Sequence, residues 1–493
     1  MSETVAQQGS ALEISAAIKA KKISVAEAVS AYIEKAEKND KQFNAFLALS
    51  KESALKRANE IQALIDKGEE LSPLAGTPIA LKDNISTIGL ETTCASKILT
   101  GYKPVFNATI TEKLERAGMI VIGKLNMDEF ALGGSSETGA FGAAHNPWDT
   151  TRVCGGSSGG SAAAIAAGEA PITLGTDTGG SIRQPCSFCG VTGIKPTYGS
   201  VSRYGIVAFA SSLDQAGPIG QNIEDCAALL SIISGPDEKD STCVIKEPFN
   251  FSEKRTDMKG VKIGLPRNYL EGGIEDEVKA AVLAAAKEFE TAGAVVEEFE
   301  MPLMDYMIPT YYIIAAAEVS SNLSKYDGLK YGYRSPNAKT LSEVYRLSRS
   351  EGFGMEAKRR IMLGSFVLSS GYYDAYYKKA LQARALLKDA YSKLFGRFDI
   401  IISPTAPTTA YKLGDNIGDP VKMYMGDIYT VSINLAGLPA AALPCGFDKQ
   451  GLPIGFQLIG DAFSESKIIN AARVFQNRTD YHKKKPSING GAS

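Results

Sequence analysis

Two serines set among pairs of glycines are the residues of this sequence best suited to chemistry. Ser157 lies in the run Gly-Gly-Ser-Ser-Gly-Gly, and Ser181 lies in Asp-Thr-Gly-Gly-Ser-Ile-Arg. Glycine lets the main chain adopt angles that are closed to other residues, so backbone N–H groups can come close to a reacting atom. A serine in such a loop can attack a carbonyl carbon beside an oxyanion pocket built from main chain. These motifs therefore predict acyl transfer through a serine ester.

Two other interpretations of the glycine-rich run fit the neighbouring residues less well. A flexible linker is disfavoured, because the alanine-rich residues 161–167 predict a small-faced helix and residues 172–175 predict a buried strand. A phosphate-binding loop ends in Gly-Lys followed by Ser or Thr, and this run contains no lysine. The run also matches the Gly-x-Ser-x-Gly turn of α/β-hydrolases, but that fold needs a histidine base downstream of the serine.

The sequence offers a lysine rather than a histidine as the base. Of its two histidines, His145 precedes both serines and His482 lies in a lysine-rich tail, so a Ser-His-Asp triad has poor support. A carboxylate or a neutral lysine must then take the serine proton. The best candidate is Lys82, which ends the short apolar stretch Pro-Ile-Ala-Leu-Lys and is predicted to lie at the end of a strand. The alternative is an ordinary lysine on a surface strand.

With these three residues in this order, the chain resembles the amidase signature family. That family combines a lysine in Pro-Ile-Ala-Leu-Lys-Asp, a bridging serine in Gly-Gly-Ser-Ser-Gly-Gly and a nucleophilic serine in Gly-Gly-Ser-Ile-Arg, which correspond to Lys82, Ser157 and Ser181. The resemblance implies that Ser181 attacks a carboxamide. It implies that Ser157, hydrogen-bonded between Ser181 and neutral Lys82, relays the proton. It also implies a cis peptide bond between Gly156 and Ser157.

The residues that flank Ser181 have predicted supporting roles. Asp177 and Arg183 are interpreted as a structural pair that braces the loop, rather than as catalytic groups, because a paired carboxylate is a poor base near neutral pH. Thr176 and Ser158 are expected to support the site through hydrogen bonds. The main-chain N–H groups expected to hold the tetrahedral oxyanion are those of Thr178, Gly179, Gly180 and Ser181.

The resemblance extends beyond the catalytic motifs, from about residue 10 to about residue 480, and is strongest to the glutaminase components of tRNA-dependent amidotransferases. Segments that carry it include Asn-Met-Asp-Glu-Phe at 126–130, Lys-Arg-Arg-Ile at 358–361 and Ser-Pro-Thr-Ala-Pro-Thr at 403–408. It implies glutamine as the substrate, with Arg360 on the α-carboxylate, Asp427 on the α-ammonium and Tyr312 in the pocket wall. Arg359 or Lys358 could replace Arg360, and Tyr312 could be a core residue.

A chain of this kind is expected to work in a heterotrimer with two other amidotransferase proteins, the B and C subunits. The resemblance implies that the B subunit uses ATP and Mg²⁺ and makes most contacts with the misacylated tRNA, and that the C subunit is small. Ammonia from glutamine would then convert Glu-tRNA(Gln) to Gln-tRNA(Gln). This chain itself is expected to hold no cofactor and no metal. The alternatives are a stand-alone amidase acting on small amides and a catalytically silent scaffold.

Composition agrees with an ordinary enzyme of 493 residues. The formal net charge of −2 provides no basic field for nucleic acid. Seven cysteines without disulfide spacing favour the cytoplasm, and Cys186 and Cys189 are interpreted as packed thiols rather than as a zinc site. No long apolar run and no signal peptide is recognised. One amidase domain is expected over 1–493, with N-terminal helices at 10–70, a catalytic core at 71–235, a C-terminal elaboration at 255–480 and a disordered tail at 484–493.

Hydrophobic periodicity predicts the elements that must position these residues. One helix is expected at 11–21, and a second is expected to begin at the capping box of Ser24 and Glu27 and to end at about 39. Two further helices are expected to begin at Lys51 and at Thr109. A strand at 261–265, a helix at 275–292 and a strand at 295–300 predict a βαβ unit. Further strands are expected at 119–122, 399–403, 441–444 and 455–459. The alternation predicts an α/β fold, with a mixed, largely parallel central sheet covered by helices on both faces.

Overall fold

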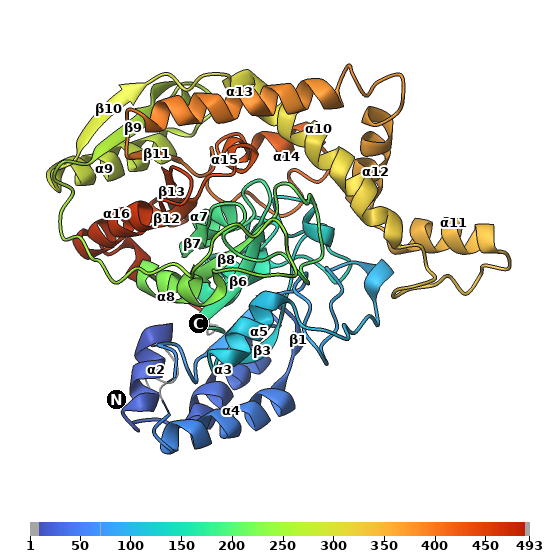
Figure 1. Ribbon diagram of the computed structural model, residues 1–493, viewed down its shortest axis with the longest axis horizontal. Helices are drawn as coiled ribbons and strands as arrows, with labels where there is room; N and C mark the ends of the chain where they lie inside the picture. The colour runs from blue at the N-terminus through green and yellow to red at the C-terminus, as the bar shows by residue number, and fades with distance from the viewer. Residues whose placement is uncertain (1–8, 70, 489–493) are drawn as a thin grey trace.

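The computed structural model describes residues 9–69 and 71–488, and these are organised around one 11-stranded sheet (Figure 1). From one edge to the other, the strands of this sheet are β1 (Phe46–Leu49), β3 (Ile120–Leu125), β2 (Pro78–Lys82), β6 (Ile172–Asp177), β8 (Gln215–Gly220), β7 (Thr192–Lys195), β12 (Ala440–Phe447), β13 (Pro453–Gly460), β11 (Ile400–Pro404), β9 (Lys262–Pro266) and β10 (Val295–Phe299). A separate pair is formed by β4 (His145–Asn146) and β5 (Asp149–Val153).

The sheet is mixed, as predicted. Parallel ladders join β2 to β3 and β6, and they join β9 to β10 and β11. The other neighbouring strands pair antiparallel. The helix α9 (Asp276–Thr291) connects β9 to β10, which confirms the predicted βαβ unit.

Helices surround the sheet, and both of its faces are buried. In β2 the alternating side chains of Ile79 and Leu81 belong to one apolar cluster, whereas Ala80 belongs to another that includes the N-terminal helices. The other helices are α2 (Ala11–Lys19), α3 (Val25–Asn39), α4 (Lys51–Asp66), α5 (Thr109–Arg116), α6 (Gly159–Ala166), α7 (Arg183–Cys189), α8 (Ile223–Ile233), α10 (Met304–Asn322), α11 (Leu341–Gly352), α12 (Met355–Val367), α13 (Tyr377–Phe395), α14 (Pro420–Met425), α15 (Val431–Ala436) and α16 (Glu465–Arg478).

Local sequence signals account for several helix boundaries. The capping box predicted at the start of α3 is present, because the Ser24 hydroxyl accepts from the Glu27 N–H while the Glu27 carboxylate accepts from the Ser24 N–H. The part of the predicted disordered tail that the structure describes, 484–488, ends with Ile488 packed against the cluster of N-terminal helices. The rest of that tail lies outside the described residues.

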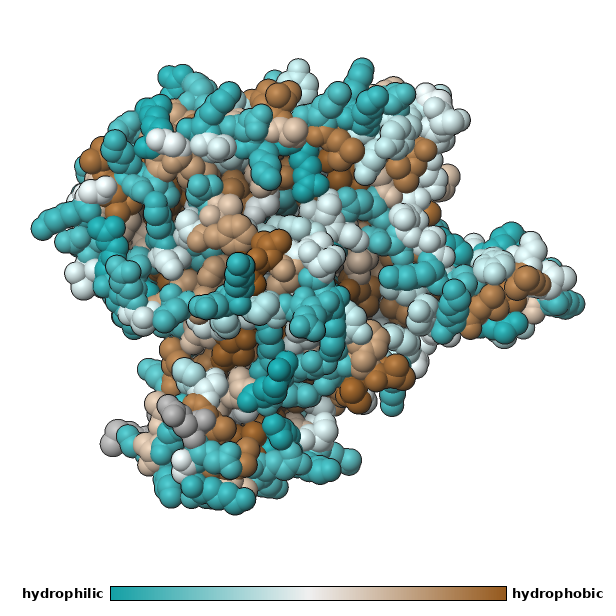
Figure 2. Space-filling model, in the orientation of Figure 1, coloured by the Kyte–Doolittle hydropathy of each residue, from teal (hydrophilic) through white to brown (hydrophobic). Residues whose placement is uncertain are grey.

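The long helices between β10 and β11 lie along the top and the right of the view in Figure 1, outside the central strands. Among them α10 and α12 pack against each other and carry Tyr312 and Arg360. Polar residues cover most of the face seen in Figure 2, with apolar residues scattered between them. None of the helices in the described residues is long and apolar enough to cross a membrane.

Candidate active site

Lys82 lies at the carboxyl end of a buried strand. It is the last residue of β2, every residue of which is buried between the parallel neighbours β3 and β6. The Lys82 side chain is 0% exposed. The strand thus places the Lys82 amine in the protein interior, beside the glycine-rich loops. The alternative that Lys82 is an ordinary surface lysine is wrong.

Three oxygen atoms surround the Lys82 amine. Nζ lies 2.7 Å from Ser157 Oγ, 2.9 Å from Ser158 Oγ and 3.3 Å from the carbonyl oxygen of Thr176. The carbonyl can only accept, and the Ser158 hydroxyl already donates to that carbonyl at 3.0 Å, so both must accept hydrogen from the amine. A neutral amine has two N–H bonds and one lone pair. The lone pair is therefore left for the Ser157 hydroxyl, which suits Lys82 as the base.

Burial sets the protonation of Lys82. Desolvation lowers the pKa of its amine to about 7, because an ammonium ion is disfavoured away from water. Nearby carboxylates act in the opposite direction, and the largest of these contributions comes from Asp128. A pKa near neutrality leaves much of the amine uncharged under physiological conditions, as a general base requires.

Ser157 is held by a loop that tolerates only glycine before it. The Gly156–Ser157 peptide bond is cis, as the resemblance implied. A side chain at position 156 would collide with the Asp128 carboxylate. That carboxylate accepts the Ser135 and Ser136 N–H groups at 3.3 and 2.9 Å. Asp128 is a site residue that the catalytic motifs do not identify, although it lies in the segment 126–130 that carries the resemblance.

Ser181 lies in the turn between β6 and α7. It is 6% exposed and lines a cavity. Within the described part of the chain no hydrogen bond joins its hydroxyl to that of Ser157, so the predicted continuous relay is only half present: the leg from Ser157 to Lys82 is formed. Catalytic hydrogen bonds are often long without substrate and shorten in the Michaelis complex.

The four main-chain N–H groups predicted to bind the oxyanion differ in their hydrogen bonds and in their position relative to the cavity. The Gly180 N–H donates to Asp177 Oδ1 at 2.9 Å, so in this structure it is engaged within the loop. Within residues 9–69 and 71–488, the N–H groups of Gly179 and Ser181 donate to no protein acceptor, and both residues line the cavity. Thr178 does not line it; its hydroxyl donates to Asp214 at 2.7 Å. Of the four predicted donors, Gly179 and Ser181 are those that line the cavity and whose N–H groups lack a protein acceptor among the described residues.

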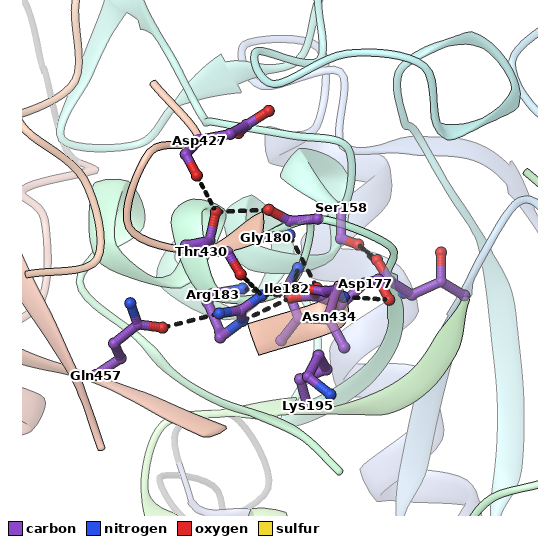
Figure 3. Close-up of polar contacts among 12 residues, drawn as sticks. Ser158, Asp177, Gly180, Ile182, Arg183, Lys195, Asp427, Thr430, Asn434 and Gln457 are labelled. Carbon is purple, nitrogen blue, oxygen red and sulfur yellow. Dashed lines mark hydrogen bonds and ion pairs between the residues drawn. The ribbon is translucent and has the colours of Figure 1, made fainter. Parts of the chain in front are cut away.

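Asp177 and Arg183, which flank the turn that contains Ser181, form a fully buried ion pair (Figure 3). Arg183 Nε and Nη2 donate to the two Asp177 oxygens at 3.0 and 3.1 Å. Burial alone would raise the pKa of Asp177, but the Arg183 charge overrides it and holds the pKa well below its usual range. Asn434 donates to Asp177 and Gln457 accepts from Arg183, each at 2.9 Å. Asp177 is thus a fixed anion that braces the loop, as expected.

This pair yields a stability prediction. Arg183→Met should reduce the free energy of unfolding by about 3 to 5 kcal/mol, because it leaves the 0%-exposed Asp177 charge unpaired. The matched control is Arg397→Met, which breaks the exposed pair with Glu297 and should cost at most about 1 kcal/mol. Urea unfolding of the two variants measures the difference. Equal midpoints would contradict the bracing role.

The three predicted substrate-binding residues come together at the same cavity. Tyr312, Arg360 and Asp427 line it with Ser181, although they come from α10, from α12 and from the loop after α14. The Tyr312 hydroxyl donates to Asp427 Oδ2 at 2.7 Å. Arg360 is 3% exposed, whereas the side chain of Arg359 is 41% exposed and lines a neighbouring pocket. Arg360 is the member of the basic run that lines the cavity with Ser181.

Two further residues, which contact the cavity-lining Tyr312 and Arg360, are not identified by the motifs. Tyr424 stacks on Tyr312 with ring centroids 3.9 Å apart, and Glu356 accepts from Arg360 Nε at 2.7 Å. The spacing of Glu356 and Arg360, four residues apart, is the signal that could have revealed this pair on a helix. Tyr424 has no such local signal, because its partners are distant in sequence.

Cys186 and Cys189 are buried thiols in α7, as expected. The Cys189 thiol donates to the Cys154 carbonyl at 3.5 Å. In the portion of the chain that is described, no three His, Cys, Asp or Glu side chains gather in an arrangement that could hold a metal ion.

Comparison with known proteins places these features in a family context. Residues 27–469 match the profile of a family described as Amidase. The chain is 57% identical to the A subunit of glutamyl-tRNA(Gln) amidotransferase from Agathobacter rectalis, over 94% of this chain and 93% of that protein. It is 53% identical to the protein of the same name from Geobacillus kaustophilus, over 97% and 98% of the two chains.

Solved structures with the same fold include relatives of these proteins. The crystal structure of the A subunit of glutamyl-tRNA(Gln) amidotransferase from Thermotoga maritima superposes with a TM-score of 0.77 at 40% identity, and the match covers 94% of this chain and 97% of that one. A bacterial aryl acylamidase of the amidase signature family shares the fold with a TM-score of 0.85 at 24% identity, over 98% and 99% of the two chains.

Proposed function

Because the chain belongs to the amidase family, we propose that it cleaves a carboxamide through an ester on Ser181, with Ser157 and Lys82 moving the proton. The short contact between Lys82 and Ser157 supports this assignment, as does the place of Ser181 on the wall of the adjoining cavity.

The reaction is a two-step acyl transfer. Ser181 Oγ attacks the carboxamide carbon while its proton passes to Ser157, and the Ser157 proton passes to the Lys82 lone pair. The oxyanion that forms accepts hydrogen bonds from the Gly179 and Ser181 N–H groups. The proton returns through Ser157 to the leaving nitrogen, the C–N bond breaks and ammonia departs. Water, deprotonated by the same route, then hydrolyses the ester and restores Ser181.

Glutamine is the substrate, and the chain is the glutaminase component of a glutamyl-tRNA(Gln) amidotransferase. The observation that carries this conclusion is the placing of a buried cation, a carboxyl group and the Ser181 hydroxyl around one cavity. Arg360 binds the α-carboxylate through its planar fork, and Asp427 binds the α-ammonium. Tyr312 orients Asp427 through its hydroxyl. The side-chain amide then points toward Ser181.

The pH dependence of the reaction follows from two of these groups. Burial lowers the pKa of Lys82 to about 7 and raises the pKa of Asp427 to about 7. Lys82 works as a free amine and Asp427 as a carboxylate, so both must lose a proton and activity rises with pH. We expect kcat/KM for glutamine to fall by about tenfold or more per pH unit below neutrality. A profile that stays flat from about pH 5.5 to 8 would contradict this assignment.

The chain acts within a multi-subunit amidotransferase. We propose a heterotrimer in which the B subunit uses ATP and Mg²⁺ to activate the glutamate of misacylated tRNA and a small C subunit completes the assembly. The near-neutral charge of this chain supports a division of labour in which the B subunit makes most tRNA contacts. The seven cysteines are free, which supports a cytoplasmic location.

The test is a glutaminase assay on the chain alone and on the assembled complex, with and without ATP and Glu-tRNA(Gln). We expect ammonia release from L-glutamine, with a rate that rises by roughly 5- to 100-fold when all components are present. Gln-tRNA(Gln) should form in the same mixture. Faster hydrolysis of small aliphatic amides than of glutamine, with no effect of the partners, would instead favour the stand-alone amidase.

A further inference from the structure

Glu356 occupies a buried position directly behind the substrate-facing arginine. It is 6% exposed and lies one helical turn before Arg360 on α12. Its Oε1 accepts from Arg360 Nε at 2.7 Å and from the Tyr424 hydroxyl at 3.0 Å, while Oε2 pairs with Arg359. One carboxylate therefore joins α12 to α14, each of which supplies a residue to the cavity wall.

This arrangement leaves one edge of the Arg360 guanidinium free. The group carries five N–H donors in a rigid plane, so fixing one edge also fixes the direction of the other. Glu356 takes the Nε edge. Among the described residues, neither terminal nitrogen of Arg360 donates a hydrogen bond, and Nη1 is buried without a partner. Burying unpaired donors is costly unless a ligand satisfies them. The free edge of this cavity-lining residue has the geometry to bind a carboxylate with two parallel hydrogen bonds.

Stacked rings restrict the remaining freedom of Arg360. Its guanidinium carbon lies 4.5 Å from the ring centroid of Tyr312 and 4.6 Å from that of Tyr424, within the range of cation–π attraction. Those two rings are themselves stacked at 3.9 Å. Because Glu356 also accepts from the Tyr424 hydroxyl, it fixes both the arginine and one of the rings against it.

The charges around Glu356 indicate that it orients Arg360 and does not simply cancel the charge of that arginine. If Glu356 paired with Arg360 alone, the two formal charges would cancel and the attraction for a substrate carboxylate would be weakened. The second ion pair, to the part-exposed Arg359, leaves the three-residue group with a net charge of one positive unit. The cluster keeps a cation available at the cavity wall.

We propose that Glu356 is a positioning residue for recognition of the substrate α-carboxylate, acting through Arg360 and Tyr424. This inference rests on the proposed function, since it assumes a substrate with an α-carboxylate. Glu356 does not touch the reacting amide, so its effect falls on substrate binding and selectivity rather than on the chemical step.

The experiment compares Glu356→Ala and Glu356→Gln with the wild type, all in the assembled complex. Ammonia release is measured from L-glutamine and from 4-aminobutanamide, which is glutamine without its α-carboxylate. For Glu356→Ala we expect KM for glutamine to rise by about 10- to 100-fold, because a charged hydrogen bond that orients Arg360 is lost. The kcat value should stay within about threefold, and kcat/KM for 4-aminobutanamide should not change. Glu356→Gln, which keeps an acceptor for Arg360 Nε, should recover part of the loss.

The matched control is Glu112→Ala on α5. Glu112 pairs with Arg116 at the same four-residue spacing but on the exposed surface, so no kinetic effect is expected. If Glu356→Ala and Glu356→Gln keep the wild-type KM for glutamine, or lower kcat equally for both substrates, the inference is overturned. If Glu356→Ala does not assemble, the same comparison with Glu356→Gln decides. If the wild type hydrolyses 4-aminobutanamide as well as glutamine, the proposed function itself fails.

Discussion

Ser181→Ala should abolish ammonia release from glutamine, with a fall in kcat on the order of 10⁴-fold or more. The Ser181 hydroxyl is the group that forms the ester. Among the residues that line the cavity, Ser181 carries the one aliphatic hydroxyl. Tyr311 and Tyr312, which also line it, are phenols whose pKa values are raised well above their ordinary value by burial. Neither can replace a serine nucleophile near neutral pH. The loss is measured by coupled detection of ammonia or glutamate.

Two controls separate lost chemistry from lost structure. Ser187→Ala alters a buried serine on the helix that follows Ser181 and does not line the cavity, so activity should be kept. The Ser181→Ala complex should also still form Gln-tRNA(Gln) when ammonium chloride replaces glutamine, because only the ammonia source has been removed. Unchanged glutamine hydrolysis by Ser181→Ala would point to the silent scaffold.

Lys82→Met should lower kcat by about 10³- to 10⁴-fold. Methionine fills similar space but has no lone pair that can take a proton, so the hydroxyl pair loses its base. Lys82→Arg should be equally inactive, because a guanidinium stays protonated at any pH compatible with the fold. The measurement is single-turnover hydrolysis of glutamine, which isolates the chemical step.

Lys195→Met is the matched control for this lysine. Lys195 is 2% exposed and burial lowers its pKa to about 7, as for Lys82, yet it donates to the Pro196 carbonyl and, among the described residues, makes no hydrogen bond to Ser157 or Ser181. Its replacement should spare kcat. The double variant Ser181→Ala with Lys82→Met should be no slower than Ser181→Ala alone, because residues that act as one unit are not additive. If the losses in rate of the two single variants multiply in the double variant, Lys82 does not act as the base for Ser181.

Much of this site could be predicted from local sequence because its signals are local. The glycine pairs around Ser157 and Ser181 restrict which backbone can form there, and the apolar run that ends in Lys82 predicts a buried strand with a lysine at its end. A capping box predicts the start of α3, and alternating strand and helix patterns predict the βαβ unit. In each of these cases the physical cause lies within a few residues of the feature.

The rest depends on contacts between segments that are distant in sequence. Arg360 and Arg359 are indistinguishable by type, and their roles diverge only when α12 packs against α10. Tyr424 meets Tyr312 across more than a hundred residues of chain. No pattern of propensity or periodicity carries such information.

The mechanism is tested most sharply by trapping the covalent intermediate. The complex is mixed with L-glutamine, quenched in acid within the first turnover and digested, and the peptides are analysed by mass spectrometry. We predict a γ-glutamyl ester on Ser181, sensitive to hydroxylamine and absent from Ser181→Ala and Lys82→Met. A γ-glutamyl group on Ser157 or on any other residue, formed at the rate of turnover, would contradict the assignment of Ser181 as the nucleophile and of Lys82 as its base.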